Sequence, residues 1–94
     1  MSPELVIIGS KLYKCVAMGT ADKTIVYSCP WPLTTDDDWT EEFAVTTSTV
    51  SSTHEFCHLD LYKNNFVISY RTHTGYSCNM FSQSGRALGT ANSI

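Results

Sequence analysis

The sequence has few positive charges and no cluster of them. Six Lys and Arg residues stand against nine Asp and Glu residues, and the net charge is −3, so a groove that follows a phosphate backbone is not expected. No apolar run approaches the length that crosses a membrane. The motifs GxSxG, GxGxxG and Walker A are also missing. These absences argue against a nucleic-acid partner, a membrane segment and the enzyme classes that carry those motifs.

The chain also lacks the tight cysteine pairs, CxxC or CxxxC, that usually supply half of a zinc site. Its cysteines, Cys15, Cys29, Cys57 and Cys78, are even in number and widely spaced. This pattern predicts a disulfide framework and an oxidising, secretory or extracellular environment. Three pairings are open on the residues alone. Four buried thiols in a cytosolic domain are the alternative.

Nothing in the sequence repeats at helical spacing, whereas short alternating segments rich in Thr, Val, Ile, Tyr and Phe predict an all-β domain. The 94 residues are enough for one such domain. Six core strands are expected in a small antiparallel sandwich. Their predicted bounds are Lys11–Met18, Lys23–Cys29, Trp39–Thr47, Val50–Phe56, Cys57–Tyr62 and Phe66–Thr72.

The domain organisation follows from these strands. Residues 1–10 are an N-terminal extension, 11–81 the β-sandwich domain, and 82–94 a polar, flexible C-terminal tail. Within the extension, Leu5–Ile8 is a short strand or an ordered arm. The core is predicted from one face of each strand: Leu12, Val16, Ile25, Tyr27, Phe43, Val45, Phe56, Leu59, Leu61, Val67 and Ser69 or its neighbours.

The segments around the cysteines resemble a known family. CVA at residue 15, IVYSCP at residue 25, CHLDLY at residue 57 and then Cys78 are similar to the ToxB-like branch of the fungal MAX effectors. The intervals between successive cysteines are 14, 28 and 21 residues, and an Asn-bearing turn follows the Cys-x-Leu-x-Leu run. The resemblance covers roughly Leu12 to Cys78. It implies a six-stranded antiparallel β-sandwich of two three-stranded sheets.

The resemblance also implies a disulfide pairing and a function. The pairs would be Cys15–Cys57 and Cys29–Cys78, each contributing about 4 kcal/mol to stability. The protein would be a secreted virulence or avirulence protein, extracellular or translocated into the host cell, that binds a host plant protein as a monomer and is not an enzyme. No cofactor or metal is expected, because neither the histidines nor Asp36–Asp38 have the spacing of a metal site.

Some MAX effectors extend the sheet of a heavy-metal-associated domain of a plant immune receptor with their second strand. An open strand edge offers unpaired N–H and C=O groups for such pairing. Trp39 is a further candidate contact, because exposed aromatics beside charge are typical of binding hot spots. The alternative is that Leu5–Ile8 pairs with the second strand and closes its edge. The resemblance places the docking edge at Lys23, Thr24, Ile25, Val26 and Tyr27.

A second resemblance concerns Asn64-Asn65 and the THTG run at residue 72, which are similar to the C-terminal part of guanyl-specific fungal ribonucleases. That chemistry needs a carboxylate base, an arginine and a histidine within reach of one another. The N-terminal helix of those enzymes has no counterpart here. A ribonuclease-like protein, active or degenerate, is therefore an alternative, and a secreted inhibitor of a host hydrolase is another. The candidate ribonuclease residues are Glu41, Glu42 or Glu55, with Arg71 and His73, and His54 and His58 in reserve.

Overall fold

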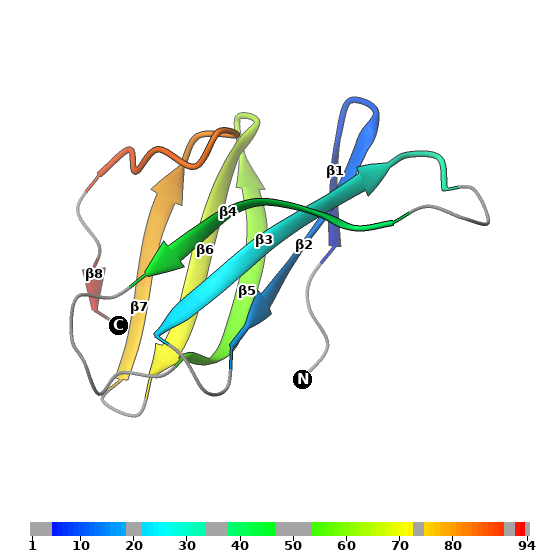
Figure 1. The fold of residues 1–94 in the computed structure, drawn as a ribbon. Helices are drawn as coiled ribbons and strands as arrows, with labels where there is room; N and C mark the ends of the chain where they lie inside the picture. The colour runs from blue at the N-terminus through cyan, green and yellow to red at the C-terminus, as the bar shows by residue number, and fades with distance from the viewer. Residues whose placement is uncertain are drawn as a thin grey trace.

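The fold comes from a computed structural model, which describes residues 5–18, 22–33, 38–46, 54–72, 75–89 and 92–93. Within these ranges, eight strands form two antiparallel sheets that pack face to face, with sheet A in front of sheet B in Figure 1. The strands of the two sheets cross obliquely (Figure 1). In the same ranges, no helix is long and apolar enough to cross a membrane.

Each sheet follows the order of the chain. Sheet A contains β1 (Leu5–Ile8), β2 (Lys11–Ala17), β3 (Lys23–Pro30) and β4 (Thr40–Thr46), in the order β1-β2-β3-β4. Sheet B contains β5 (His54–Tyr62), β6 (Asn65–Thr72), β7 (Gly75–Phe81) and the two-residue β8 (Asn92–Ser93), in the order β5-β6-β7-β8. The predicted turn between β5 and β6 is confirmed: Lys63 and Asn64 have positive φ angles of 51° and 62°, which suit a tight hairpin.

The prediction of an all-β domain with two antiparallel sheets is confirmed, whereas the count of six strands in two sets of three is wrong. Leu5–Ile8 pairs with β2 and is the edge strand of sheet A. Residues 54–62 form one strand where two were predicted. Gly75–Phe81 forms a strand that was not predicted. Sheet A therefore has four strands, and sheet B has three long strands and the short β8.

The core lies between the two sheets and is centred on Phe66, which is fully buried. Its ring meets Tyr13 edge-on at a centroid distance of 4.9 Å and lies 5.9 Å from the ring of Phe43. These contacts join β2, β4 and β6, so one aromatic cluster spans both layers. The buried cluster as a whole contains Tyr13, Cys15, Val26, Val45, Cys57, Leu59, Phe66, Ile68, Tyr70 and Phe81.

The predicted core residues are correct for β4, and for Leu59 and Leu61 of β5. Phe56 of β5 instead lies opposite the exposed Arg71 on the outer face of sheet B. In β2 and β3 the predicted face is the outer one, although Ile25 on it is buried.

In β6, Val67 points to the outer face of sheet B and was wrongly predicted. Of the alternatives Ser69 or its neighbours, the neighbours Ile68 and Tyr70 belong to the cluster. Successive side chains of a strand point to opposite faces, so choosing Val67 instead of Ile68 inverts the whole strand. Leu12 is buried, as predicted, yet it lies on the outer face of sheet A.

Cys15 and Cys57 face each other across the core, where β2 crosses β5, and they approach to 2.7 Å. Both are buried, and no disulfide links any of the four cysteines in the structure. The Cys15 side chain hydrogen-bonds to Cys57 and lowers the pKa of the Cys57 thiol; burial opposes this effect, and a hydrogen bond with the Ala17 backbone adds to it. The structure therefore brings together the first of the two expected cysteine pairs.

The second expected pair, Cys29–Cys78, is wrong. Cys78 lies opposite Ser69 and so points to the outer face of sheet B. Cys29 lies opposite Leu12 and points to the outer face of sheet A. Two packed sheets are about 10 Å apart, and cysteines on their opposite outer faces cannot reach the separation of less than about 7 Å between Cα atoms that a disulfide needs.

The chain continues in an ordered turn beyond the boundary predicted at Ser82. The Ser82 N–H donates to the Arg86 carbonyl at 2.9 Å, and the Leu88 N–H donates to the Met80 carbonyl at 2.8 Å. Gly85 has a φ of +92°, and a Cβ at this position would lie 2.5 Å from Cγ of Phe43. Only glycine therefore lets the turn lie against β4.

His54 is the largest polar side chain that is fully buried. The Thr24 hydroxyl and Nδ1 of His54 share a hydrogen bond of 2.8 Å, and the imidazole stacks on the Tyr70 ring at a centroid distance of 4.2 Å. In the part of the chain that the structure describes, Nε2 has no hydrogen-bond partner. Burial lowers the pKa of His54 from its ordinary value of 6.5, while the charge of Asp22 acts in the opposite direction.

We expect His54 to make the fold sensitive to acid. Because the folded-state pKa is lowered, the unfolded chain binds the proton at a higher pH than the folded chain does. The free energy of unfolding should therefore fall as the pH drops below 6.5, by up to about 1.4 kcal/mol per pH unit. Urea unfolding at about pH 5 and about pH 8 measures this difference.

The variant His54→Phe keeps a ring against Tyr70 but cannot be protonated, so its stability should differ less between the two pH values than that of the unaltered protein. The exposed His58 provides a matched control, and His58→Gln should retain the full difference. An equal pH dependence in the unaltered protein and in His54→Phe would contradict this assignment.

Candidate functional site

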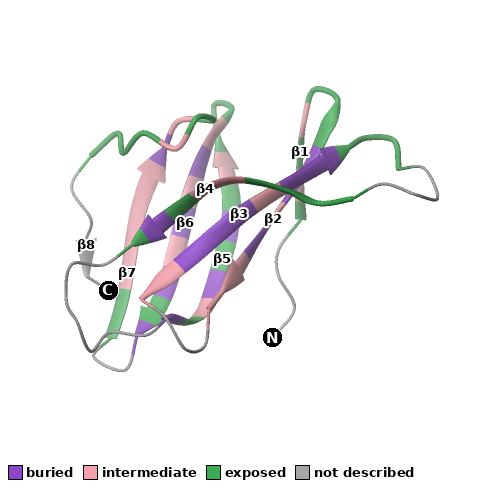
Figure 2. Ribbon diagram, in the orientation of Figure 1, coloured by how far each residue is buried: buried purple, intermediate pink, exposed green. Residues whose placement is uncertain are grey.

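Large apolar side chains are exposed at one end of sheet A. Figure 2 shows β3 mostly buried, whereas β1 and the segment that follows β3 are exposed. Single exposed apolar residues are ordinary, but a group of them beside a free strand edge marks a contact surface. The group consists of Leu5 and Ile7 of β1, Trp31 and Leu33 after β3, and Trp39 before β4.

The strand register assembles part of this group on the outer face of sheet A. Leu5 lies opposite Lys14, and Lys14 lies opposite Tyr27, so the three side chains form a row across β1, β2 and β3. Ile7 begins the next row, which continues through Leu12 and Cys29. We name as the outer patch the residues Leu5, Ile7, Lys14, Tyr27 and Trp39.

Lys14 is the charged centre of the outer patch. Its Nζ lies 4.2 Å from the centroid of the Trp39 ring and 5.7 Å from that of Tyr27. A cation over the face of an aromatic ring is attracted by the ring quadrupole. Lys14 therefore holds Tyr27 and Trp39 together, and the patch presents two rings, two aliphatic side chains and one positive charge.

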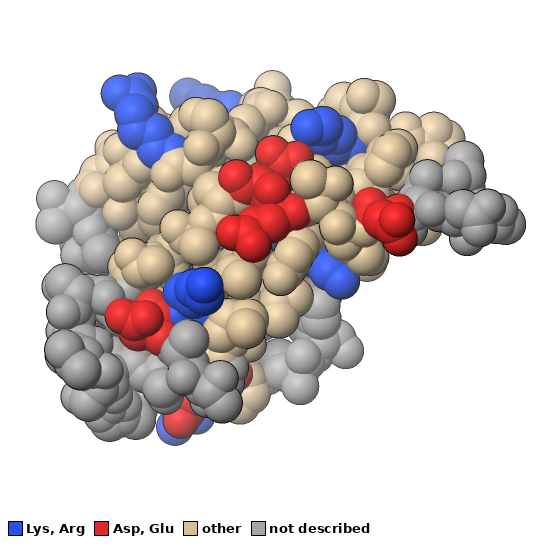
Figure 3. All heavy atoms as spheres, in the orientation of Figure 1, with Lys and Arg blue, Asp and Glu red and all other residues tan. Residues whose placement is uncertain are grey.

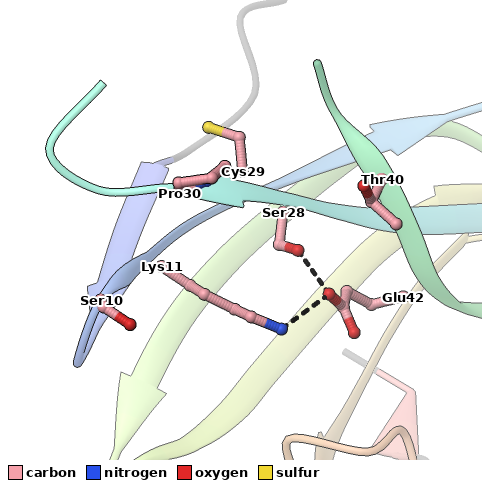
Figure 4. Close-up of a pocket in the computed structure, with 7 residues that line it drawn as sticks. All are labelled: Ser10, Lys11, Ser28, Cys29, Pro30, Thr40 and Glu42. Carbon is pink, nitrogen blue, oxygen red and sulfur yellow. Dashed lines mark hydrogen bonds and ion pairs between the residues drawn. The ribbon is translucent and has the colours of Figure 1, made fainter. Parts of the chain in front are cut away.

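The reverse side of the same end of sheet A is polar. Figure 4 shows Ser28 and Glu42 on one side of β3, with the Cys29 thiol on the other. The Ser28 hydroxyl donates to the Glu42 carboxylate, and Lys11 Nζ lies 3.3 Å from the same oxygen. The Ser28 hydrogen bond, and then the Lys11 ammonium, lower the pKa of Glu42, while burial opposes them. These groups line a cavity of about 310 Å³.

This polar cavity does not have the arrangement of a hydrolase. A nucleophilic serine needs a base that accepts its proton and a group that orients the base, commonly an imidazole held by a carboxylate. The buried His54 bonds to Thr24, which is four residues before Ser28 on β3 and so about 13 Å away. Glu42 and Lys11 instead form an ion pair at the end of the sheet. Exposed ion pairs of this kind contribute about 0–1 kcal/mol to stability.

The predicted open edge at the second strand is wrong. β3 pairs with β2 on one side and with β4 on the other, so its backbone has no free edge. The alternative, closure of that edge by Leu5–Ile8, is also wrong, because β1 pairs with β2. Thr24, Ile25 and Val26 are buried, whereas Lys23 and Tyr27 are partly exposed. Of the candidate contacts, the structure brings Tyr27 and Trp39 together.

The candidate ribonuclease residues are scattered, with one exception. Glu41 and Glu42 lie on β4, His54 is in the core, and His73 lies outside the described residues. Glu55 and Arg71 meet on the outer face of sheet B, where Oε1 lies 3.5 Å from Nε. His58 lines a cavity beside Arg71. The described residues contain no group of three metal-ligating side chains in reach of one ion.

Charge on the face in view does not favour a polyanion. Among the residues drawn in colour in Figure 3, acidic and basic side chains are interspersed, and no continuous basic surface appears.

Comparisons with protein-family models, with curated proteins and with solved structures find no match for this chain. The functional argument therefore rests on the geometry of the described residues.

We expect the contact between Lys14 and Trp39 to be measurable as a coupling. Lys14→Ala and Trp39→Leu should each lower stability, and the double variant should lose less than the sum, with a coupling energy of about 0.5–1 kcal/mol. Urea unfolding of the four proteins gives this coupling energy. Lys23→Ala with Trp39→Leu is the matched control pair, which should be additive. A coupling of zero for Lys14 and Trp39 would show that the patch is not held together in this way.

Proposed function

We propose that this protein is a secreted fungal effector of the MAX type, close to the ToxB-like branch, that binds a host plant protein as a monomer and is not an enzyme. The observation that supports this proposal most strongly is the outer patch beside the edge of β1. Exposed Trp and Tyr around one cation are typical of binding hot spots. A heavy-metal-associated domain of an immune receptor is the partner that we propose.

The edge of β1 supplies a backbone site next to the outer patch. In the described part of the chain β1 pairs with β2 alone, so its other edge can extend the sheet of a partner. Leu5 and Ile7 are exposed to 57% and 45%, and they flank that edge with apolar surface. We therefore move the proposed docking site from the second expected strand to β1 and the outer patch.

The position of Cys15 and Cys57 supports a secreted protein. We propose that these two cysteines form a disulfide once the protein reaches an oxidising compartment. They meet between the two sheets, so the bond would link the layers directly. Small secreted domains with modest cores commonly depend on such bonds. The lowered pKa of the Cys57 thiol favours the thiolate that reacts in disulfide formation.

Peptide mapping under non-reducing conditions should recover Cys15 linked to Cys57, with Cys29 and Cys78 open to alkylation after unfolding. Reduction of this bond should lower the free energy of unfolding by about 4 kcal/mol, because it releases a long loop in the unfolded chain. Cys29→Ser serves as the control and should leave the linked peptide in place. Recovery of Cys15 linked to any other cysteine would contradict the proposal.

Partner binding should depend on the outer patch. We expect Trp39→Ala and Tyr27→Ala each to weaken binding to a recombinant heavy-metal-associated domain about tenfold, as is usual for hot-spot residues. Tyr62→Ala is the matched control, because Tyr62 is 53% exposed and lies on sheet B. Biolayer interferometry with the oxidised, full chain gives the dissociation constants.

Two further assays separate this proposal from the alternatives. Capture of a protease or glycosidase from leaf extract, with the same loss in Trp39→Ala, would replace the receptor by a hydrolase and make the protein an inhibitor. Cleavage of RNA by the unaltered protein, with loss of that cleavage in Arg71→Ala, would support the ribonuclease alternative instead. Binding that is unchanged in both outer-patch variants would reject the proposed docking surface.

A further inference from the structure

The outer face of sheet B carries a second site, which the proposed function does not use. It is built from cross-strand rows, because Phe56, Arg71 and Tyr76 lie opposite one another on β5, β6 and β7. His58 and Ser69 belong to the next row. The two rows border a cavity of about 260 Å³, which is lined by Phe56, His58, Ser69, Tyr70, Arg71 and Tyr76.

Arg71 is held between two rings in this cavity. Its Cζ lies 5.7 Å from the ring centroid of Phe56 and 5.7 Å from that of Tyr76. Glu55 Oε1 lies 3.5 Å from Nε. This ion pair engages one edge of the guanidinium, and the two terminal nitrogens form the other edge. A guanidinium fixed in this way is preorganised to bind a carboxylate or phosphate through two parallel hydrogen bonds.

The surrounding charge selects between these two anions. Glu55 offsets the positive charge of Arg71. A doubly charged phosphate on Arg71 would be close to the Glu55 carboxylate, whereas a singly charged carboxylate fits the small remaining positive potential. Like charges in one site raise the free energy of the complex, so the site favours a monoanion.

The walls of the cavity indicate what the carboxylate is attached to. Phe56 and Tyr76 offer aromatic surface on both sides of Arg71, and flat ligands stack on such rings at a favourable distance. The cavity of about 260 Å³ is below the range of about 300–1,000 Å³ of drug-sized sites. One aromatic ring with a carboxylate fits this volume, and a ligand with several rings does not.

We propose that the outer face of sheet B binds a monocyclic aromatic carboxylate, with Arg71 on the carboxylate, Phe56 and Tyr76 on the ring, and Ser69 as a further hydrogen-bond donor. This site lies on the opposite side of the sandwich from the outer patch. A ligand here therefore leaves the outer patch open for a partner protein.

Benzoate is the probe, titrated into the oxidised protein and followed by amide NMR. We expect saturable shifts on β5, β6 and β7. Acetate, which lacks the ring, and benzyl alcohol, which lacks the charge, should each bind about tenfold more weakly or worse. Phenyl phosphate should bind more weakly than benzoate because of the Glu55 carboxylate. Tighter binding of phenyl phosphate, or of acetate, would overturn the proposed ligand class.

Arg71→Gln should weaken benzoate binding about tenfold or more. The affinity of Arg71→Lys should lie between those of the unaltered protein and Arg71→Gln, because lysine keeps the charge but cannot form two parallel hydrogen bonds. Lys63→Gln is the matched control, since Lys63 lies over the Tyr62 ring at 5.3 Å on the same sheet, and it should leave benzoate binding unchanged. If Arg71→Gln does not fold, Tyr76→Leu removes one wall and should weaken benzoate severalfold.

Two further results would overturn the proposal. One is a benzoate response that does not saturate or is equal in the unaltered protein and in Arg71→Gln and Tyr76→Leu. The other is displacement of benzoate by a short single-stranded RNA, which would assign the face to bases stacked on Phe56 and Tyr76 instead of to a small acid.

Discussion

The contact between β2 and β5 joins the two layers, and the rest of the structure depends on it. Neither sheet can bury its apolar face alone, so each needs the other as a cover. Cys15 and Cys57 meet where the strands cross, while Tyr13 of β2 packs edge-on against Phe66. Both outer faces take their geometry from this crossing, because the register of β2 sets which side chains of sheet A point outward and the register of β5 does the same for sheet B.

The element types could be predicted from the sequence far better than the faces of the strands. β2 is apolar on both sides: Leu12 is 6% exposed and Tyr13 is 5% exposed. When both faces are buried, the alternation of apolar and polar residues no longer indicates which one meets the opposite sheet. Bulges at Val26/Tyr27 and at His54/Phe56 also shift the register, and a sequence pattern with a strict period of two does not reveal them.

β7 was not predicted for a different reason. Its sequence, GYSCNMF, contains Gly and Asn, which are depleted in strands. Phe81 is the only one of its side chains in the buried cluster among the described residues. The strand therefore forms because β6 offers it a long pairing edge from Phe66 to Thr72. Such tertiary pairing leaves no local signal in the chain.

The candidate site shows the same division between local and tertiary information. Trp39 could be proposed as a contact residue because exposed aromatics beside charge have a recognisable composition, whereas Tyr27 was a candidate only through the family resemblance. Lys14 could not, since its role depends on lying opposite Tyr27 in the register of β2 and β3. The pair of Glu55 and Arg71 likewise depends on the register of β5 and β6, which shifts between His54 and Phe56. Residues far apart in sequence become neighbours only when the register is known.

The outer patch has a structural task as well as the proposed binding task. Leu12 and Cys29 are buried, at 6% and 3% exposure, although they point away from the main core. They lie in the row that Ile7 begins, so the outer face of sheet A has a thin apolar layer of its own. Side chains at its rim cover that layer and are also the surface that we propose for a partner. Under this proposal, replacing one of them would lower stability and affinity together, and only affinities compared at equal folded fraction would separate the two effects.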